Sequence, residues 1–154
     1  ILPQTDIEYI LQGDNLKENI VVNAPRESYE YIFELELCNL TASLTDTGDI
    51  ALNDGEETIY ILPAPFMYDA DGRYSEAVEY TLTPSNGNGK YTLTVTADES
   101  WLNAEKRTFP VTIDPTITAA CTPVSPWGKT PRHTSCFQIC PMHWNCPFLR
   151  RNCG

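Results

Sequence analysis

The sequence predicts an all-β fold: an antiparallel β-sandwich followed by an irregular, cysteine-rich C-terminal tail. Hydrophobic residues alternate with polar ones along several runs, which is the pattern of half-buried strands. Turn-forming residues separate these runs at short intervals, as in a domain made of two packed antiparallel sheets. The composition then changes abruptly after Ile117. We therefore predict a β-sandwich module over residues 1–118 and a separate tail over residues 119–154.

The clearest alternation is YEYIFELEL, residues 29–37, where aromatic and leucine side chains share one face and glutamates occupy the other. EAVEYTLT, YTLTVTA and RTFPVTI show the same period, and their threonines suit a solvated strand face. Shorter candidates lie near Ile7, Ile20 and Ile59. These seven or eight short strands favour one sandwich of two sheets.

Turn residues and one helical segment connect these strands. Residues 13–15, 46–48, 53–55, 71–72 and 86–89 are rich in Gly, Asp and Asn, which favour tight turns. Only residues 98–106, DESWLNAEK, have the character of a helical turn. Strands and helices do not alternate, and no glycine-rich phosphate loop is present, so a nucleotide-binding fold is not predicted.

Charge divides the chain into two unlike parts. The net charge of −11 combines an acidic body with a basic end. Residues 1–120 hold all 21 acidic residues and six Lys or Arg, a balance of −15, whereas the last 34 residues hold four Lys or Arg and no acid. An acidic body repels polyanions. We therefore expect no nucleic-acid partner, and no run of apolar residues predicts membrane insertion.

The segment Asp69-Ala70-Asp71-Gly72, with Glu76 and Glu79 beyond it, has the residue types of a calcium loop. Its glycine, however, follows directly after the second aspartate, which does not match the spacing of an EF-hand loop. Asp and Gly are also the ordinary residues of a hairpin turn. The turn is the favoured interpretation.

No arrangement of catalytic side chains stands out in the body. Residues 1–120 contain no histidine, so a Ser-His-Asp or Cys-His arrangement would have to borrow one from the tail. The carboxylates mostly alternate along strands, as on a solvated face. We therefore predict that the chain is not an enzyme and needs no cofactor. Cys38 is expected to be a lone thiol without a role.

Exposed aromatic rings on a sandwich are a possible carbohydrate-binding platform, because such rings stack on sugar faces. The candidates in this sequence are Tyr60, Tyr68, Tyr74 and Trp101, with Phe66 nearby. Aromatic residues at alternating strand positions are otherwise ordinary core residues. Both interpretations stay open from the sequence alone.

The tail allows three interpretations. Cys136, Cys140, His143 and Cys146 have zinc-ligand residue types, although the spacing C-x3-C-x2-H-x2-C is not the usual one. The five tail cysteines also suit a disulfide scaffold, with one left over unless Cys38 pairs. The absence of acids and of periodicity is typical of a shifted reading frame. A one-base shift from the Ala120 codon permits a sequence that regains acidic residues.

The body resembles a β-rich module of bacterial RHS (tyrosine-aspartate repeat) surface proteins. The resemblance covers about residues 1–118 and is carried by "DIEYILQGDNLKENIVV", "ILPAPFMYDADGRYSEAVEYTL" and "GKYTLTVTADESWLNAEKRTFPVTIDPTI". In that family a DNRLRE domain typically follows the module, and a further strand usually precedes the region that opens this chain. The resemblance therefore implies a fragment that lacks one N-terminal edge strand.

The resemblance implies a structural or interaction module of a secreted or cell-wall-associated bacterial protein. Its partners would be other domains of the same parent protein. One alternative is a carbohydrate-binding module that anchors the parent to cell-wall or host glycan. A second alternative is an acidic pro-region that releases a cysteine-rich secreted peptide, residues 121–154.

Overall fold

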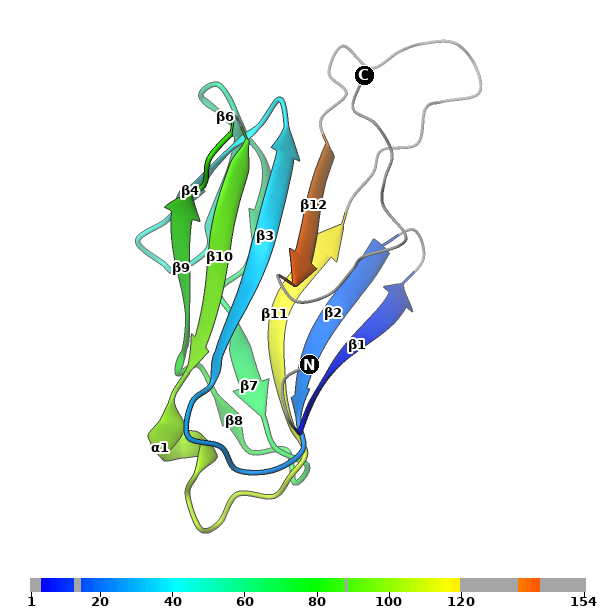
Figure 1. Ribbon diagram of the computed structural model, residues 1–154, viewed down its shortest axis with the longest axis vertical. Helices are drawn as coiled ribbons and strands as arrows, with labels where there is room; N and C mark the ends of the chain where they lie inside the picture. Colours follow the sequence, from blue (N-terminus) through cyan, green and yellow to red (C-terminus); the bar gives the residue numbers. More distant parts are fainter. Residues whose placement is uncertain (1–3, 13–14, 88, 120–135, 142–154) are drawn as a thin grey trace.

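Two antiparallel sheets face each other, and a third, smaller sheet lies at one end of the molecule (Figure 1). The computed structural model describes residues 4–12, 15–87, 89–119 and 136–141. The predicted all-β antiparallel sandwich is confirmed, since every strand pair is antiparallel. Among the described residues, no helix is long and apolar enough to span a membrane.

We name the sheets A, B and C. Sheet A has the order β1 (Thr5–Gln12), β2 (Asn15–Val22), β11 (Val111–Ala119), β7 (Phe66–Tyr68), β8 (Tyr74–Ser75). Sheet B has the order β12 (Cys136–Pro141), β3 (Glu30–Cys38), β10 (Lys90–Ala97), β9 (Val78–Pro84). Sheet C has the order β4 (Thr41–Leu44), β5 (Ile50–Asp54), β6 (Glu57–Leu62).

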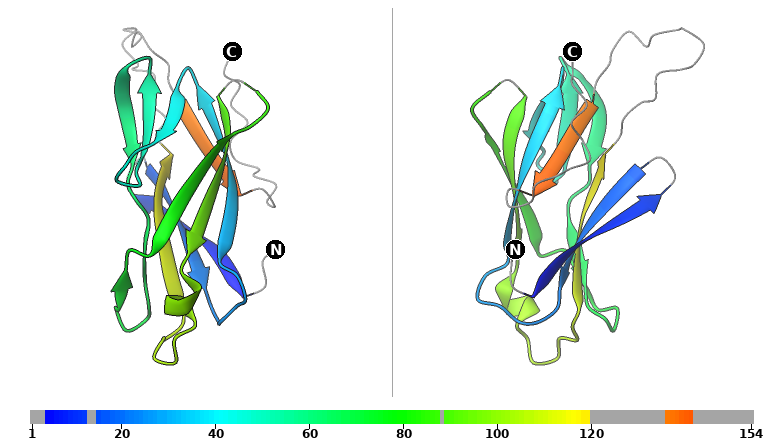
Figure 2. Two further views of the ribbon diagram at one scale, coloured as in Figure 1. Left: turned by 90° about the vertical axis from the view of Figure 1, so that its left-hand side faces the viewer. Right: turned by 45° about the vertical axis from the view of Figure 1, so that its right-hand side comes forward.

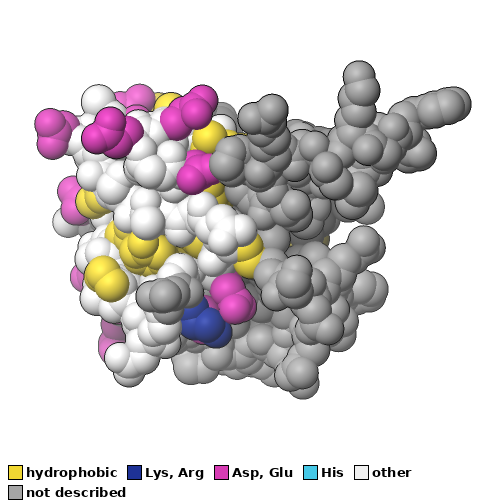
Figure 3. Space-filling view, turned by 90° about the horizontal axis from the view of Figure 1, so that it is seen from above, with side chains coloured by type: hydrophobic (Ala, Val, Ile, Leu, Met, Phe, Trp, Pro, Cys, Tyr) yellow, Lys and Arg dark blue, Asp and Glu magenta, His cyan; other side chains and the backbone are white. Residues whose placement is uncertain are grey.

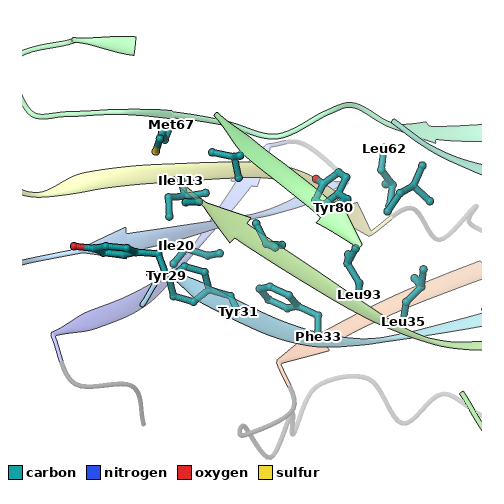
Figure 4. Close-up of a cluster of buried hydrophobic side chains, with 14 of the residues drawn as sticks. Ile20, Tyr29, Tyr31, Phe33, Leu35, Leu62, Met67, Tyr80, Leu93 and Ile113 are labelled. Carbon is teal, nitrogen blue, oxygen red and sulfur yellow. The ribbon is translucent and has the colours of Figure 1, made fainter. Parts of the chain in front are cut away.

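The core lies between sheets A and B, as the alternating pattern requires (Figures 2 and 4). Strand β3 alternates strictly between exposed and buried positions, and Phe33 and Leu35 are almost fully buried. Ile20 and Ile113 contribute from the facing sheet. Each such side chain contributes about 1.5–3 kcal/mol by leaving water, so this core is the main stabilising element of the fold.

A bulge interrupts β11 where it pairs with β2. Ile113 pairs with Ile20 and Ile117 with Glu18, so extra residues on β11 face a single residue on β2. Pro115 lies in this bulge, where a residue without an N–H is tolerated. The buried hydroxyl of Tyr80, from sheet B, donates a hydrogen bond to the Pro115 carbonyl. The bulge is therefore tied to the opposite sheet across the core.

The helical turn predicted over residues 98–106 is present but shorter, as α1 (Glu99–Leu102). Asp98 caps it by accepting a hydrogen bond from the Trp101 backbone N–H at 2.6 Å. Leu102 is fully buried. The helix thus closes the lower end of the core in Figure 1.

Part of the tail forms regular structure. Strand β12 pairs with β3, and the backbone of Cys136 lies opposite that of Cys38. Cys38 is disulfide-bonded, so the expectation of a lone thiol is wrong. Residues 120–135 and 142–154 lie outside the described residues. The domain boundary at residue 118, the missing edge strand beside β1 and the frame-shift interpretation all stay predictions.

Candidate functional site

The hairpin of β7 and β8 presents the most distinctive surface side chains. Tyr68 pairs with Tyr74, and residues 69–73 form the connecting turn. The hairpin turn that we favoured for this segment is therefore confirmed. The carboxylate of Asp69 is fully buried beneath this turn. It accepts hydrogen bonds from the backbone N–H groups of Asp71 and Arg73 at 3.1 and 2.8 Å. The turn is therefore organised around one aspartate.

Two arginines complete the ring of donors around Asp69. The guanidinium groups of Arg73 and Arg107 each lie 3.0 Å from its Oδ2 atom. Burial alone would raise the pKa of Asp69, but the hydrogen bonds from Arg73, Arg107 and Thr108 outweigh it and hold the pKa well below its usual range. We call Asp69, Arg73, Arg107 and Thr108 together the Asp69 clasp. It fixes the β7–β8 hairpin to the loop that precedes β11.

Trp101 belongs to the support of this clasp. The Arg107 guanidinium lies over the Trp101 ring, 3.2 Å from its centroid. The Arg107 Nε–H group also donates to the Trp101 carbonyl at 2.9 Å. Because a cation covers its face and the ring packs against the core, Trp101 is not an open surface for a sugar.

Phe66, Tyr68 and Tyr74 form what we call the aromatic cluster. The Phe66 ring lies 6.2 Å from that of Tyr68 and 5.3 Å from that of Tyr74, with interplanar angles of 29° and 35°. Met67, between the first two, points inward and is fully buried. Tyr68 and Tyr74 remain 36% and 54% exposed. The three rings therefore form a shallow platform on the outer face of sheet A.

A pocket of about 580 Å³ adjoins this platform. Its walls come from the β4–β5 turn, the β6–β7 connection and the segment that leads from β8 into β9. Tyr74 belongs to both features, because it lines the pocket and contacts Phe66. Its hydroxyl donates a hydrogen bond to Glu76 at 3.1 Å. Platform and pocket are thus one continuous surface.

Asp49 holds two walls of the pocket together. Its Oδ1 atom accepts a hydrogen bond from the Ala64 backbone N–H at 2.8 Å, and its own backbone carbonyl accepts one from Thr45 at 2.9 Å. Hydrogen bonds from Thr47 and Ala64 lower the pKa of this carboxyl, so it is ionised at neutral pH. The β4–β5 turn is therefore locked against the β6–β7 connection.

The pocket is acidic. Asp46, Glu76 and Glu79 line it, and among the residues that the structure describes, none of those that line it is Lys, Arg or His. A carboxylate accepts several hydrogen bonds and donates none. The pocket is consequently suited to a ligand rich in hydroxyl or ammonium donors and is unfavourable to an anion.

The structure separates the residues that the sequence proposed for sugar binding. Tyr68 and Tyr74 come together with Phe66, whereas Tyr60 lies on β6 in sheet C and Trp101 lies in α1. Tyr60 packs partly buried against the core. The platform thus contains two of the four predicted residues, and sugar binding itself stays a prediction.

Two of the four predicted zinc ligands lie outside the part of the chain that the structure describes. Cys136 and Cys140 lie in β12, and His143 and Cys146 follow it beyond the described residues. Within the described residues, no group of three or more His, Cys, Asp or Glu is placed to hold a metal ion. The zinc hypothesis for the tail therefore stays untested.

Glu18 is a buried acid that the sequence did not single out. It lies on β2 opposite Tyr9 and is only 5% exposed. Burial raises the pKa of Glu18 to about 7, although a hydrogen bond from Tyr9 acts in the opposite direction. Among the described residues its Oε2 atom has no hydrogen-bond partner. We treat Glu18 as a pH-sensitive stability element and not as part of the site.

The fold and the site define a β-sandwich module with an exposed aromatic face. Comparison with known sequences relates it to much longer proteins. Over 123 residues, 75% of this chain, it is 31% identical to the tRNA nuclease WapA of Bacillus subtilis strain 168. It is similarly related to the tRNA(Glu)-specific nuclease WapA of B. subtilis subsp. natto, at 31%, and the tRNA3(Ser)-specific nuclease WapA of Bacillus spizizenii, at 30%.

The aligned region is 5% of the length of each of these relatives. No protein-family model matches the chain. No solved structure matches it either. The prediction that the chain is not an enzyme is contradicted, because the proteins that it matches are named as nucleases. The absence of histidine from residues 1–120 was therefore an unsafe basis for that prediction.

Proposed function

We propose that the chain is a β-sandwich module of a large, secreted or cell-wall-associated bacterial protein of the RHS type, related to the nucleases named WapA. The observation that carries this proposal is the alignment over 75% of the chain with proteins about twenty times longer than the aligned segment. Within that parent, the module serves as a rigid structural unit. Its partners are the neighbouring domains of the same polypeptide.

An apolar strand at the edge of sheet C supports this role. Strand β6 is the end strand of that sheet, and Ile59 and Ile61 on its outer face are 36% and 61% exposed. Figure 3 shows hydrophobic side chains among acidic ones at this end of the molecule. Exposed aliphatic side chains on an edge strand favour contact with another surface, which in a long polypeptide is an adjacent domain.

A chimera tests the proposal directly. The 123-residue segment of Bacillus subtilis WapA that aligns with this chain is replaced by the corresponding segment of this chain. We expect the chimera to accumulate at full length outside the cell and in the cell-wall fraction, and to cleave tRNA as the unaltered protein does. Immunoblotting of cell fractions and a tRNA cleavage assay measure the two properties.

Two further proteins make the result decisive. A chimera that carries Leu93→Asp, a charge in the fully buried core, should be degraded within the parent. A protein in which a flexible glycine-serine linker replaces the segment should also lose full-length product. If the linker version is exported, retained and active like the chimera, the module has no structural role and the proposal fails.

A further inference from the structure

We propose that the aromatic cluster and the adjoining pocket form a binding site for an oligosaccharide, either neutral or carrying amino sugars. This proposal does not rest on the function proposed above. It rests on three properties of one surface: a cluster of aromatic rings in which Tyr68 and Tyr74 are exposed, acceptor groups beside these rings, and a local framework that fixes both.

The rings provide the stacking surface. The ring centroids of Tyr74 and Phe66 lie 5.3 Å apart with an interplanar angle of 35°, and those of Phe66 and Tyr68 lie 6.2 Å apart with an interplanar angle of 29°. A pyranose presents a face of C–H groups, and the negative face of an aromatic ring attracts the positive edges of such groups. Adjacent rings at these spacings can support consecutive sugar units.

The pocket supplies the polar half of the recognition. Glu76 and Glu79 line it together with Tyr74, and Asp46 lines it from the β4–β5 turn. Each carboxylate accepts hydrogen bonds from hydroxyl groups, and hydrogen bonds to charged acceptors are the stronger ones. A sugar stacked on Tyr74 would extend its hydroxyl groups over these acceptors.

Charge determines which sugars fit. Within the described part of the chain, the pocket lining contains three carboxylates and no cationic side chain, and residues 1–120 as a whole are strongly acidic. Uronic-acid and phosphate-bearing polymers would be repelled, whereas an ammonium group on an amino sugar would be attracted. The class of ligand is therefore a neutral or cationic glycan.

The surface is held in place before any ligand arrives. The buried carboxylate of Asp69 fixes the hairpin that carries Tyr68 and Tyr74, through contacts of 2.8 to 3.1 Å with Asp71, Arg73 and Arg107. Asp49 locks the opposite wall of the pocket through its 2.8 Å contact with Ala64. Rings that are already ordered lose little conformational entropy on binding, which favours affinity for a small ligand.

A neighbouring protein domain fits this surface less well than a sugar. A stable protein interface buries on the order of 1,000 Å² or more, with an apolar centre. Here three rings are bordered by charged groups, with Asp71 and Arg73 at the turn on one side and Glu76 on the other. A small apolar platform surrounded by hydrogen-bonding groups matches the mixed surface of a sugar.

The test uses the full chain and defined hexasaccharides. Isothermal titration calorimetry is carried out with cellohexaose, N-acetylated chitohexaose, its deacetylated form and an oligogalacturonate of similar length. We expect binding of at least one neutral or amino-sugar oligomer and none of the oligogalacturonate. Circular dichroism of every variant checks that the fold is retained.

Matched variants locate the site. Tyr74→Ala should weaken binding roughly tenfold, because it removes one stacked ring. Tyr9→Ala, at a tyrosine on β1 that is 41% exposed, should change it less than about twofold. A Glu76→Gln/Glu79→Gln double variant keeps the shape but removes two charges. It should weaken the deacetylated oligomer by roughly fivefold and the neutral ones less.

Three outcomes would overturn the proposal. The first is that no hexasaccharide binds the folded chain. The second is that Tyr74→Ala and Tyr9→Ala weaken binding equally. The third comes from tyrosine nitration of the parent protein. If Tyr68 and Tyr74 are protected there without sugar, while exposed Tyr9 is modified, a neighbouring domain covers the aromatic cluster.

Discussion

Gly89 is the residue at which the smallest possible substitution should have the largest effect. It precedes β10, has φ of +75°, and its carbonyl accepts a hydrogen bond from the Leu37 N–H at 2.7 Å. A Cβ atom at this position would lie 2.2 Å from the Leu37 carbonyl oxygen, much closer than any non-bonded contact allows. Gly89→Ala must therefore move the backbone of β10 relative to that of β3.

Gly55 offers a control, because it also has a positive φ but lies in open space, so that alanine there would meet no steric clash. Its φ is +61°, and a Cβ atom there would meet nothing within 4 Å. A left-handed conformation costs an L-residue about 1–2 kcal/mol, and alanine recovers about 0.4–1 kcal/mol by restricting the unfolded chain. We expect Gly55→Ala to lower the free energy of unfolding by about 1 kcal/mol.

Gly89→Ala carries the same conformational cost and two further ones. The displaced backbone weakens the hydrogen bond to Leu37, which contributes about 1 kcal/mol, and the shift disturbs the packing beneath it by about 1–3 kcal/mol. We expect a total loss of about 3–5 kcal/mol. Urea unfolding followed by circular dichroism measures both variants. If Gly89→Ala loses no more stability than Gly55→Ala, the close approach of Gly89 to Leu37 is not present in the protein.

Two further predictions concern buried polar groups. Burial raises the pKa of Glu18 to about 7, above its ordinary 4.5, so between these values the folded state binds more protons and stability falls as pH rises. Ionisation of Glu18 should lower the free energy of unfolding by about 3 kcal/mol between pH 4.5 and pH 8. Urea unfolding at several pH values measures this dependence, and Glu18→Gln should abolish that part of it. If the unaltered chain and the variant depend on pH in the same way, the prediction is wrong. Tyr80→Phe leaves the Pro115 carbonyl without its donor in the core and should cost about 1–3 kcal/mol. Tyr74→Phe, which removes a hydroxyl at the surface, should change thermal stability little, and equal losses for the two variants would argue against the Tyr80 contact.

The strands of the sandwich were predictable because each carries a local signal. The alternation of YEYIFELEL appears in β3 as buried Tyr31, Phe33 and Leu35, which alternate with exposed positions. The turns at Gly48, Gly55 and Gly72 all use positive φ, as their composition indicated. What the alternation did not reveal was the separation of β4, β5 and β6 into a third sheet. Strand partners depend on contacts between distant residues, which a single-strand pattern does not contain.

The candidate site was predictable only in part for the same reason. Tyr68 and Tyr74 flank a recognisable turn, so their proximity follows from the hairpin. Nothing local distinguishes Trp101 from them, yet Arg107 covers its ring. The Asp69 contact to Arg107 joins residues 38 positions apart. Such a pairing leaves no spacing signal in one sequence.

The Asp69 clasp makes folding and ligand presentation depend on the same side chain, and this decides how the site must be tested. Replacing Asp69 would leave Arg107 in its buried position without an anionic partner, and the side chain of Arg107 is only 7% exposed. The hairpin would then lose both its anchor and the placement of Tyr68 and Tyr74. A loss of sugar binding in such a variant would therefore say nothing about the rings. Substitutions at Tyr74, which is half exposed and lies outside the Asp69 clasp, separate recognition from folding.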